Sequence, residues 1–420
     1  MSKSSTRRKR RALRGGPQND FRGLPDNQAF LVRVGQVLHS YGTPSHRMER
    51  LLSRMAEFLG LSAQVLATPT SLMLSIGQGR AERTMLLRVS PGNVDLGKLV
   101  ELDELLESLE DGHINVRQAR GRLETLAQSK GRFGPIPLAL AFSAASGSAA
   151  VFLKGGMGEF VAALVLGLLI FLGGWVVRKI PREIEMTEAF LAFGAAFAAL
   201  LWTRHVYPIH YPKVTMAALI ILIPGLSLTV AMLELATQHL SSGVARLAGA
   251  GATMLTILLG VALAWKLGDS HSVIAHEPIA MAASWKWGIM ALAPMSFAVL
   301  FQVRISEWWV VYLAGVAGLL GAMLGAHWLQ DDLGPFVGAF AVGIVGNLYA
   351  RYLDRPASVA QMPGMLLLVP GTVGYSSLIS FLEAGPMEGT ELAFRTAMVG
   401  SALVGGLLAA NALIPPRRTL

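Results

Sequence analysis

The sequence predicts a polytopic α-helical membrane protein with an N-terminal soluble α+β domain. Hydrophobic residues make up 53% of the 420 residues and charged residues only 15%, with a mean hydropathy of +0.49, which is typical of chains with many membrane spans. Most charges lie in residues 1–130, whereas apolar segments follow one another from Pro135 to Pro415. Two of these segments contain a Pro-Gly pair in similar surroundings. We therefore expect about ten transmembrane helices, arranged as two inverted five-helix repeats with broken Pro-Gly helices.

The composition also excludes several classes of protein. The net charge of +9 could indicate nucleic-acid binding, but membrane proteins collect Lys and Arg in cytoplasmic loops, and we prefer that interpretation. Without cysteine, the chain has no disulfide, thiolate zinc site or cysteine nucleophile. No apolar run follows the basic first residues, so no cleavable signal peptide is expected. No G-x-x-x-x-G-K-[ST] motif occurs, which disfavours a nucleotide-driven pump.

Residues 1–25 are predicted to form a basic disordered tail. The first fourteen residues contain seven Lys and Arg without an acid, and such blocks are usually disordered. The tail either stays in solvent, where it fixes the orientation of the chain, or binds anionic lipid headgroups.

Residues 26–130 are expected to form a cytoplasmic α+β domain. Apolar residues at helical spacing predict a helix ending at Tyr41-Gly42 and another that starts at Thr43-Pro44, with Thr43 as its cap. Ser62–Ile76 alternates loosely and predicts one strand, disturbed by Pro69, that pairs with a strand over Thr84–Ser90. Two further helices are predicted over 94–111 and 116–128.

The apolar segments predict two membrane repeats, over residues 135–265 and 285–415. Arg and Lys in the linkers favour cytoplasmic N- and C-termini. Five spans per repeat is an odd number, so the second repeat must be inverted relative to the first, which suits alternating access. The predicted spans are 137–153, 158–177, 188–202, 214–236, 245–264, 288–303, 308–326, 334–350, 363–382 and 394–413.

The two Pro-Gly segments, ILIPG at Ile221–Gly225 and LLVPG at Leu367–Gly371, are the predicted binding site. Hydroxyl residues and an acid follow each pair, and an arginine stands twelve residues beyond each acid. Proline interrupts helix hydrogen bonding, and paired interruptions of this kind point to a transporter's binding site. Alternatively, the hydroxyls bond to their own helix. The predicted binding residues are Pro224, Gly225, Ser227, Thr229, Pro370, Gly371, Thr372, Tyr375 and Ser376.

Glu234 is the predicted proton-coupling residue, because an ionisable group within a span is costly and indicates function. Alternatively, Glu234 faces the membrane interface or pairs with Arg246. Arg246 and Arg395 are predicted to hold carboxylates or helix ends, although for Arg246 a simple flanking anchor on the cytoplasmic side is slightly favoured. His271 and His276 with Glu277 lack a further ligand, so neither a metal site nor a cofactor is expected.

Both halves of the chain contain distinctive motifs: YGTPSHRMER at Tyr41–Arg50, VLATPTSLML at Val65–Leu74, IPGLSLT with HLSSGVARLAGA at His239–Ala250, and MPGMLLLVPGTVGYSSL at Met362–Leu378. Together these motifs resemble the threonine/serine exporter family of bacterial inner-membrane proteins. The resemblance spans about residues 28–413 and corresponds to the fused form of a system that also occurs as two separate chains. The residues of the soluble-domain motifs are His46, Arg47, Glu49, Thr68, Pro69 and Thr70.

The resemblance implies export of threonine and serine from the cytoplasm, driven by the proton motive force and without enzymatic chemistry. Some split relatives are associated with dicarboxylate export, so small dicarboxylates are an alternative substrate. A membrane-anchored enzyme or sensor that acts through the N-terminal domain, and a channel, are further alternatives. The expected partners are the amino acid, protons and the lipid bilayer, without nucleic acid, and a homo-oligomer is left open.

Overall fold

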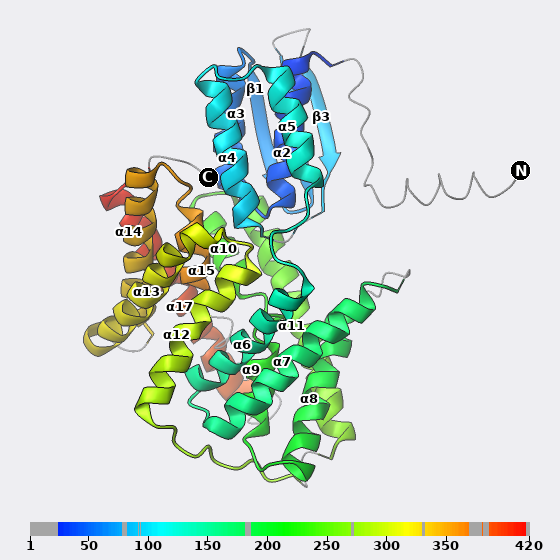
Figure 1. Cartoon of the computed structure of the whole chain (residues 1–420), viewed down its shortest axis with the longest axis vertical. Coiled ribbons are helices and arrows are strands. Elements are labelled where there is room, and N and C mark those ends of the chain that lie inside the picture. Colours follow the sequence, from blue (N-terminus) through cyan, green and yellow to red (C-terminus); the bar gives the residue numbers. More distant parts are fainter. Residues whose placement is uncertain are drawn as a thin grey trace, which may run out of the picture.

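The computed structural model describes residues 24–77, 82–90, 92, 94–180, 186–269, 273–329, 332–368, 380 and 386–416. An α/β unit stands at one end of a set of long helices (Figure 1). The predicted basic tail, apart from its last two residues, lies outside the described residues. The same holds for the second Pro-Gly pair and its hydroxyls, Pro370, Gly371, Thr372, Tyr375 and Ser376.

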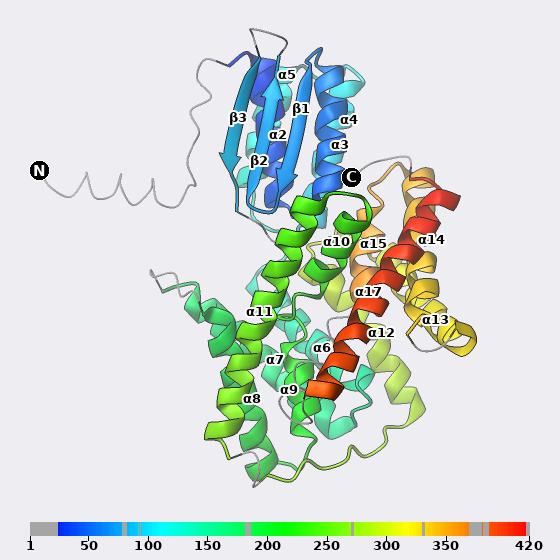
Figure 2. The ribbon, with the colours of Figure 1, turned by 180° about the vertical axis from the view of Figure 1, so that it is seen from behind.

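The α/β unit packs four helices against one face of a three-stranded antiparallel sheet, whose other face is turned to the viewer in Figure 2. Its core contains fully buried side chains such as Phe30, Leu52, Leu72 and Leu99. The sheet order is β1-β2-β3. The elements are α2 (Asp26–Ser40), α3 (Ser45–Phe58), β1 (Ala63–Thr68), β2 (Ser71–Ile76), β3 (Arg83–Arg88), α4 (Leu96–Glu110) and α5 (Val116–Gln128).

The prediction of a single strand over Ser62–Ile76 is wrong, because the chain reverses at Pro69-Thr70. Proline has no N–H to donate to a sheet and its fixed φ suits a turn. Thr68 closes the turn, since its Oγ1 accepts a hydrogen bond from the Ser71 N–H at 3.1 Å and lies 2.7 Å from Ser71 Oγ. The expected hairpin is therefore a three-stranded meander with Thr68, Pro69 and Thr70 at its first turn.

Six helices among the described residues are long and apolar enough to cross a membrane, which makes the chain a polytopic helical membrane protein. They are α6 (Pro135–Phe152), α7 (Met157–Val177), α11 (Leu240–Leu267), α13 (Trp308–Leu329), α14 (Gly334–Leu353) and α17 (Pro386–Leu413). Two further helices, α8 (Thr187–His205) and α12 (Ala283–Leu300), occupy the predicted spans 188–202 and 288–303 but are not among these six.

The fourth predicted span consists of two short helices with a break at the Pro-Gly pair. α9 (Tyr211–Leu219) ends five residues before Pro224, and α10 (Gly225–Ala236) starts directly after it. The N–H groups of Leu222 and Ile223 both donate to the carbonyl oxygen of Leu219, at 2.8 and 3.0 Å, so the turn satisfies part of its own backbone. In the other half, α15 (Ser358–Leu366) ends before the second predicted Pro-Gly pair, Pro370-Gly371.

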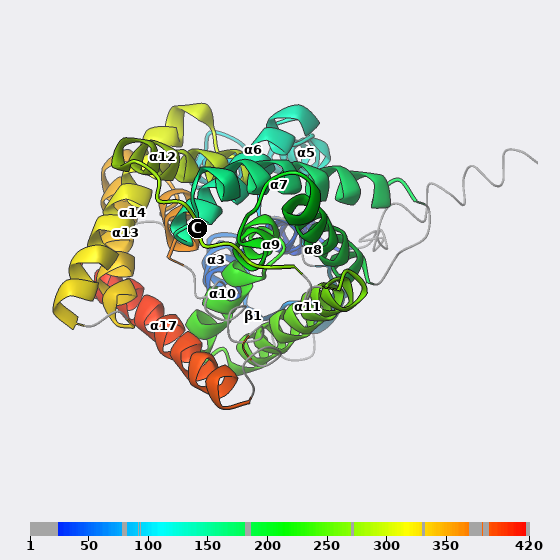
Figure 3. The same cartoon turned by 90° about the horizontal axis from the view of Figure 1, so that it is seen from below.

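Helix packing is similar in the two membrane halves. α8 packs on α11, and α14 packs on α17. A methyl group on Gly260 would overlap the carbonyl oxygen of Ala189, and one on Gly406 would overlap that of Phe336. Each glycine lies twenty residues after the first residue of a 28-residue helix, and each carbonyl belongs to the third residue of its helix. Viewed from below, α13 and α14 lie opposite α8 and α11, with α9 and α10 between them (Figure 3).

Candidate functional site

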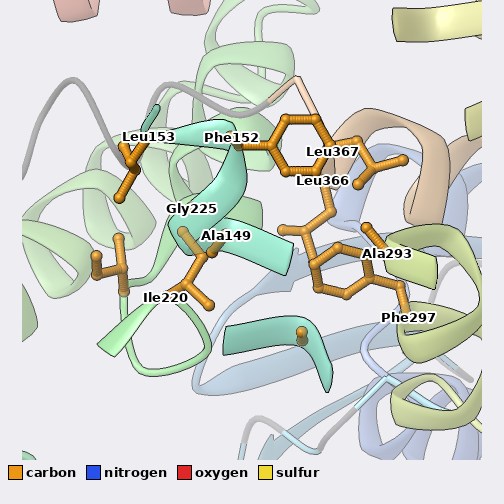
Figure 4. A pocket seen from close by; sticks show the side chains of 11 residues that line it. Ala149, Phe152, Leu153, Ile220, Gly225, Ala293, Phe297, Leu366 and Leu367 are labelled. Atoms are coloured by element: carbon orange, nitrogen blue, oxygen red, sulfur yellow. The ribbon is translucent and has the colours of Figure 1, made fainter. Parts of the chain in front are cut away.

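A cavity of about 150 Å³ lies beside the break between α9 and α10 (Figure 4). α6 and α12 form two of its sides, and the last residue of α15 with its successor closes it from the second membrane half. An apolar cavity of this volume accepts a molecule about the size of benzene. The lining residues are all apolar, namely Ala145, Ala149, Phe152, Leu153, Ile220, Ile223, Gly225, Ala293, Phe297, Leu366 and Leu367.

The predicted binding residues of the first Pro-Gly segment have different positions relative to this cavity. Gly225 lines it, directly after Pro224. Thr229 is buried, and its hydroxyl donates to the carbonyl oxygen of Gly225 at 3.2 Å, which is the alternative of a hydroxyl bonded to its own helix. Ser227 is half-buried and is not a lining residue. The side chains that line the cavity are apolar, so its polar surface comes from backbone groups, and contacts of a substrate with Ser227 and Thr229 remain a prediction.

A second polar cluster lies where the first turn of α3 meets the membrane helices. Glu234, at the end of α10, is fully buried, and its two oxygens accept four hydrogen bonds. The donors are the Ser45 N–H at 2.9 Å, the Ser242 hydroxyl at 2.8 Å, and Arg246 through Nε at 3.1 Å and Nη2 at 3.3 Å. Glu234 thus pairs with Arg246 and binds α3.

This contact overturns the predicted cap of α3. Pro44 is the N-cap residue, no side chain caps it, and the Thr43 hydroxyl has no hydrogen-bond partner. The carboxylate of Glu234, distant in sequence, instead accepts the first amide of the helix. A negative charge at this point is favourable because the free N–H groups make a helix N-terminus partially positive.

Glu49 and His239 form a neighbouring contact between the same elements. Glu49 Oε2 lies 3.1 Å from Nε2 of His239, a residue of the loop between α10 and α11. The other oxygen of Glu49 accepts the Ala67 N–H of β1 at 2.8 Å. Thr237 Oγ1 lies 3.2 Å from His239 Nδ1. Glu49 therefore links the sheet, α3 and the α10–α11 loop.

Arg47 connects α3 to the second membrane half through a chain of side-chain amides. Its Nη2 donates to Gln361 Oε1 on α15 at 2.8 Å. Gln361 Nε2 donates to Asn347 Oδ1 on α14 at 2.9 Å, and Asn347 Nδ2 donates to Asn411 Oδ1 on α17 at 2.8 Å. The first turn of α3 thus contacts both α10 and α15, the helices next to the two Pro-Gly pairs; both lie beneath the α/β unit in Figure 1.

His46 is buried at this junction, with its ring centroid 6.0 Å from that of His239. Burial, and then repulsion from Arg47 and Arg50, lowers the pKa of His46 to about 2, so the ring is neutral at physiological pH. In the described residues no hydrogen bond joins His46 to Thr70 or Ser71, and the hydroxyl of Ser71 bonds to Thr68. A hydrolytic nucleophile–base pair is therefore not formed by these residues.

A further contact joins α4 to the chain segments that follow α12 and α14. Glu104 accepts hydrogen bonds from Arg304, at 2.7 and 2.8 Å, and also from Arg355. The hydrogen bond from Arg304 is the main cause that lowers the pKa of Glu104 to about 2. The other predicted arginine, Arg395, pairs with Asp332 at 2.8 Å.

Sequence reasoning missed Ser45, Ser242, His239 and Gln361 as partners in this junction. Gln361 and Ser242 carried a usable signal, because both are polar residues in segments of otherwise apolar or small residues. Their partners, however, lie in parts of the chain far away in sequence, and no spacing rule connects them.

The six long apolar helices define a polytopic helical membrane protein. Two family models agree with this class: residues 29–268 match the model described as "Putative threonine/serine exporter", and residues 287–413 match "Threonine/Serine exporter, ThrE". The chain belongs to the threonine/serine exporter family.

Curated relatives are fungal membrane proteins. "Pheromone-regulated membrane protein 10" of Yarrowia lipolytica is 24% identical over 377 residues, covering 85% of this chain and 31% of the relative. The protein of the same name from Candida albicans is 24% identical over 396 residues (90% and 35%), and that from Saccharomyces cerevisiae 22% over 376 residues (84% and 48%). The chain thus spans about a third to a half of these relatives. No solved structure matches the chain.

Proposed function

We propose that this protein is a secondary active transporter that exports threonine and serine from the cytoplasm in exchange for protons. The observation that carries this proposal is the cavity beside the broken helix, lined from both membrane halves, in a chain of the exporter family. Interrupted helices next to such a cavity expose backbone groups that a polar substrate can bond.

The proposed architecture is ten spans in two inverted five-helix repeats. α8, α12, the α9–α10 pair and the segment 363–382 add to the six long helices. The corresponding glycine contacts, Gly260 on Ala189 and Gly406 on Phe336, support the repeat, because two unrelated helix pairs have no reason to match at both the glycine and the carbonyl position. In this arrangement the cavity lies between the repeats.

The proposed orientation has both chain ends and the α/β unit in the cytoplasm. Loops rich in Arg are cytoplasmic by the positive-inside rule. Three arginines from loops assigned to that side, Arg246, Arg304 and Arg355, lie at the end of the bundle that meets the α/β unit. The choice of a bacterial inner membrane rests on the resemblance of the motifs alone.

The α/β unit is proposed to gate the transporter through the first turn of α3. Ser45 bonds to Glu234 on α10, and Arg47 bonds to Gln361 on α15, so a movement of α3 would act on both Pro-Gly segments. The four hydrogen bonds of Glu234 favour docking over proton transfer, the role first predicted for it.

Threonine efflux from oriented vesicles, with and without an imposed pH gradient, tests the proposal. We expect gradient-dependent accumulation against a threonine gradient, lost in the Pro224→Ala/Pro370→Ala double variant and kept in Pro415→Ala, a proline outside the helices. Absence of threonine and serine flux under every gradient would refute the substrate proposal. Succinate in the same assay separates the dicarboxylate alternative, and flux without accumulation would indicate a channel.

A further inference from the structure

Four polar atoms at the junction between α3 and α15 are enclosed and have no hydrogen-bond partner: Thr43 Oγ1, His46 Nδ1, Arg47 Nη1 and Ser358 Oγ. Thr43, His46 and Ser358 are 5%, 4% and 1% exposed. Buried polar atoms are normally paired, so a group of four needs an explanation. Several unpaired atoms of the same region suggest a missing bonding partner rather than four separate defects.

These atoms belong to two short stretches that the hydrogen bond between Arg47 and Gln361 joins. Thr43 lies two residues before α3, whose first turn carries His46 and Arg47. Ser358 lies three residues before Gln361 on α15, so both side chains are on the same face of that helix. Gln361 accepts a hydrogen bond from Arg47 Nη2 at 2.8 Å, so Ser358 lies on α15 one helical turn from the residue that contacts the guanidinium.

The charges around this site are those of an anion site. In the described part of the chain no salt bridge joins Arg47 to a carboxylate; Nη2 bonds only a neutral amide. Burial lowers the pKa of Arg47 to about 10, and the group still carries its charge at neutral pH. Two acids at the same end of α3 are already occupied: Glu234 by Ser45, Ser242 and Arg246, and Glu49 by Ala67 and His239. A buried cation without a counter-charge is costly, and an anionic ligand would relieve that cost.

We propose that Arg47, together with Thr43, His46 and Ser358, binds the carboxylate group of a small amino acid at the junction of α3 and α15. Guanidinium groups bond carboxylates strongly, and two hydroxyls and a neutral imidazole can donate to the remaining lone pairs. This site is separate from the cavity at the helix break. The choice of an amino acid rests on the proposed function, whereas the preference for a carboxylate rests on the charges. An occupied site would tie α3 to α15, so the α/β unit would respond to cytoplasmic amino acid.

Hydrogen–deuterium exchange of the full chain in lipid nanodiscs tests this site. The probes are L-threonine, L-threoninamide, which lacks the carboxylate, and succinate. We expect threonine at ten times its dissociation constant to slow exchange about tenfold in peptides 43–50 and 358–366, because a ligand lost on local opening stabilises the closed form. Threoninamide should leave these peptides unchanged.

Variants of Arg47 and Arg54 test whether the slowing of exchange by threonine depends on the Arg47 guanidinium. Arg47→Gln should abolish the slowing in peptides 43–50 and 358–366 but keep any response of peptide 220–236 at the helix break. Arg47→Lys should restore part of it, since the charge returns. Arg54→Gln should behave as the parent, because Arg54 lies two turns further along α3, is exposed and pairs with Glu110. Peptide 96–110 of α4 serves as the folding control.

Each other result overturns part of the reasoning. If threonine leaves the exchange of peptides 43–50 and 358–366 unchanged but slows that of peptide 220–236, only water molecules bond to the unpaired atoms. An equal response to threoninamide, or one that survives Arg47→Gln, would refute carboxylate binding by Arg47. A junction response to succinate without one to threonine would keep the carboxylate site and refute the amino acid. No response to any probe in a protein that transports threonine would refute the site but not the proposed function.

Discussion

The replacement Glu234→Gln is expected to release α3 from the membrane helices with little change of side-chain shape. The parent carboxylate accepts four hydrogen bonds from Ser45, Ser242 and Arg246. The glutamine side chain keeps one oxygen that accepts hydrogen bonds. Its NH2 group is a donor and would face the donors that bond to the carboxylate in the parent. At least one of the two Arg246 bonds and one bond from the serines are therefore lost.

The expected cost follows from burial. Hydrogen bonds to charged groups contribute about 1.5–3 kcal/mol each, and removal of one partner from a buried ion pair costs about 3–5 kcal/mol. The Glu234 side chain is 0% exposed but that of Arg246 is 20% exposed, so water solvates part of the freed guanidinium. We therefore expect the docked state to lose about 3 kcal/mol, which corresponds to roughly a hundredfold change in the docking equilibrium at ~1.4 kcal/mol per tenfold.

Amide exchange in the first turn of α3 measures this equilibrium, because the Ser45 N–H is protected by Glu234 itself. We expect a roughly hundredfold increase in the exchange rate of peptide 43–50 in Glu234→Gln. Glu57→Gln, on the exposed side of the same helix, should change it by less than about threefold. The double variant Glu234→Gln/Arg246→Ala should cost less than the sum of the single changes, because both remove the same pair.

Unchanged exchange in Glu234→Gln would refute the docking role, since no other acceptor for the Ser45 amide is found among the described residues. The same variant also decides the proton-coupling hypothesis. Full proton-coupled threonine flux in Glu234→Gln vesicles would exclude Glu234 as the proton carrier, whereas a loss of coupling with intact exchange protection would restore it.

Three further predictions concern pH, packing and the cavity. Because the pKa of Glu104 is lowered from 4.5 to about 2, its contacts with Arg304 and Arg355 should be fully present above pH 4.5 and lost as the pH falls toward 2; proteolysis at the α4 junction should rise over that range in the parent but not depend on pH in Glu104→Gln. Gly260→Ala and Gly406→Ala should each cost about 1–3 kcal/mol by overpacking, whereas Gly249→Ala, with open space around it, should stabilise α11 by about 0.5–1 kcal/mol; thermal unfolding in detergent compares them, and equal behaviour of all three would contradict the packing. Ala149→Leu should fill the cavity and abolish threonine flux in protein that still inserts, while Ala252→Leu on the exposed face of α11 should keep it; undiminished flux in Ala149→Leu would exclude this cavity from the path.

Local features of the fold could be predicted from the sequence because they depend on nearest neighbours. The helix over 116–128 is observed with the predicted bounds, held by the Asn115–Gln118 capping box. The break at Pro224-Gly225 is likewise observed, since proline interrupts a helix wherever it stands. The turn at Pro69-Thr70 was misassigned because a strand with one irregular residue and a tight turn between two strands have almost the same apolar pattern.

The candidate site was only partly predictable. His46, Arg47, Glu49 and Glu234 were named as separate candidates, and nothing in their spacing joins the soluble motif to α10. The cap of α3 shows the limit most clearly: Thr43 is the local choice, but the carboxylate of Glu234, 189 residues beyond Ser45, accepts the first amide of the helix.

The sequence by itself determined the membrane class, the α/β unit and the place of the first helix break, because hydrophobic length, periodicity and proline act within a few residues. Only the tertiary structure decided which groups meet: Ser45 with Glu234, Arg47 with Gln361, and the helix break with the end of α15 around one cavity. The physical reason is that burial and pairing of charges are properties of three-dimensional neighbours. A buried carboxylate such as Glu234 takes its role from the donors that surround it, and these come from two different elements, α3 and α11.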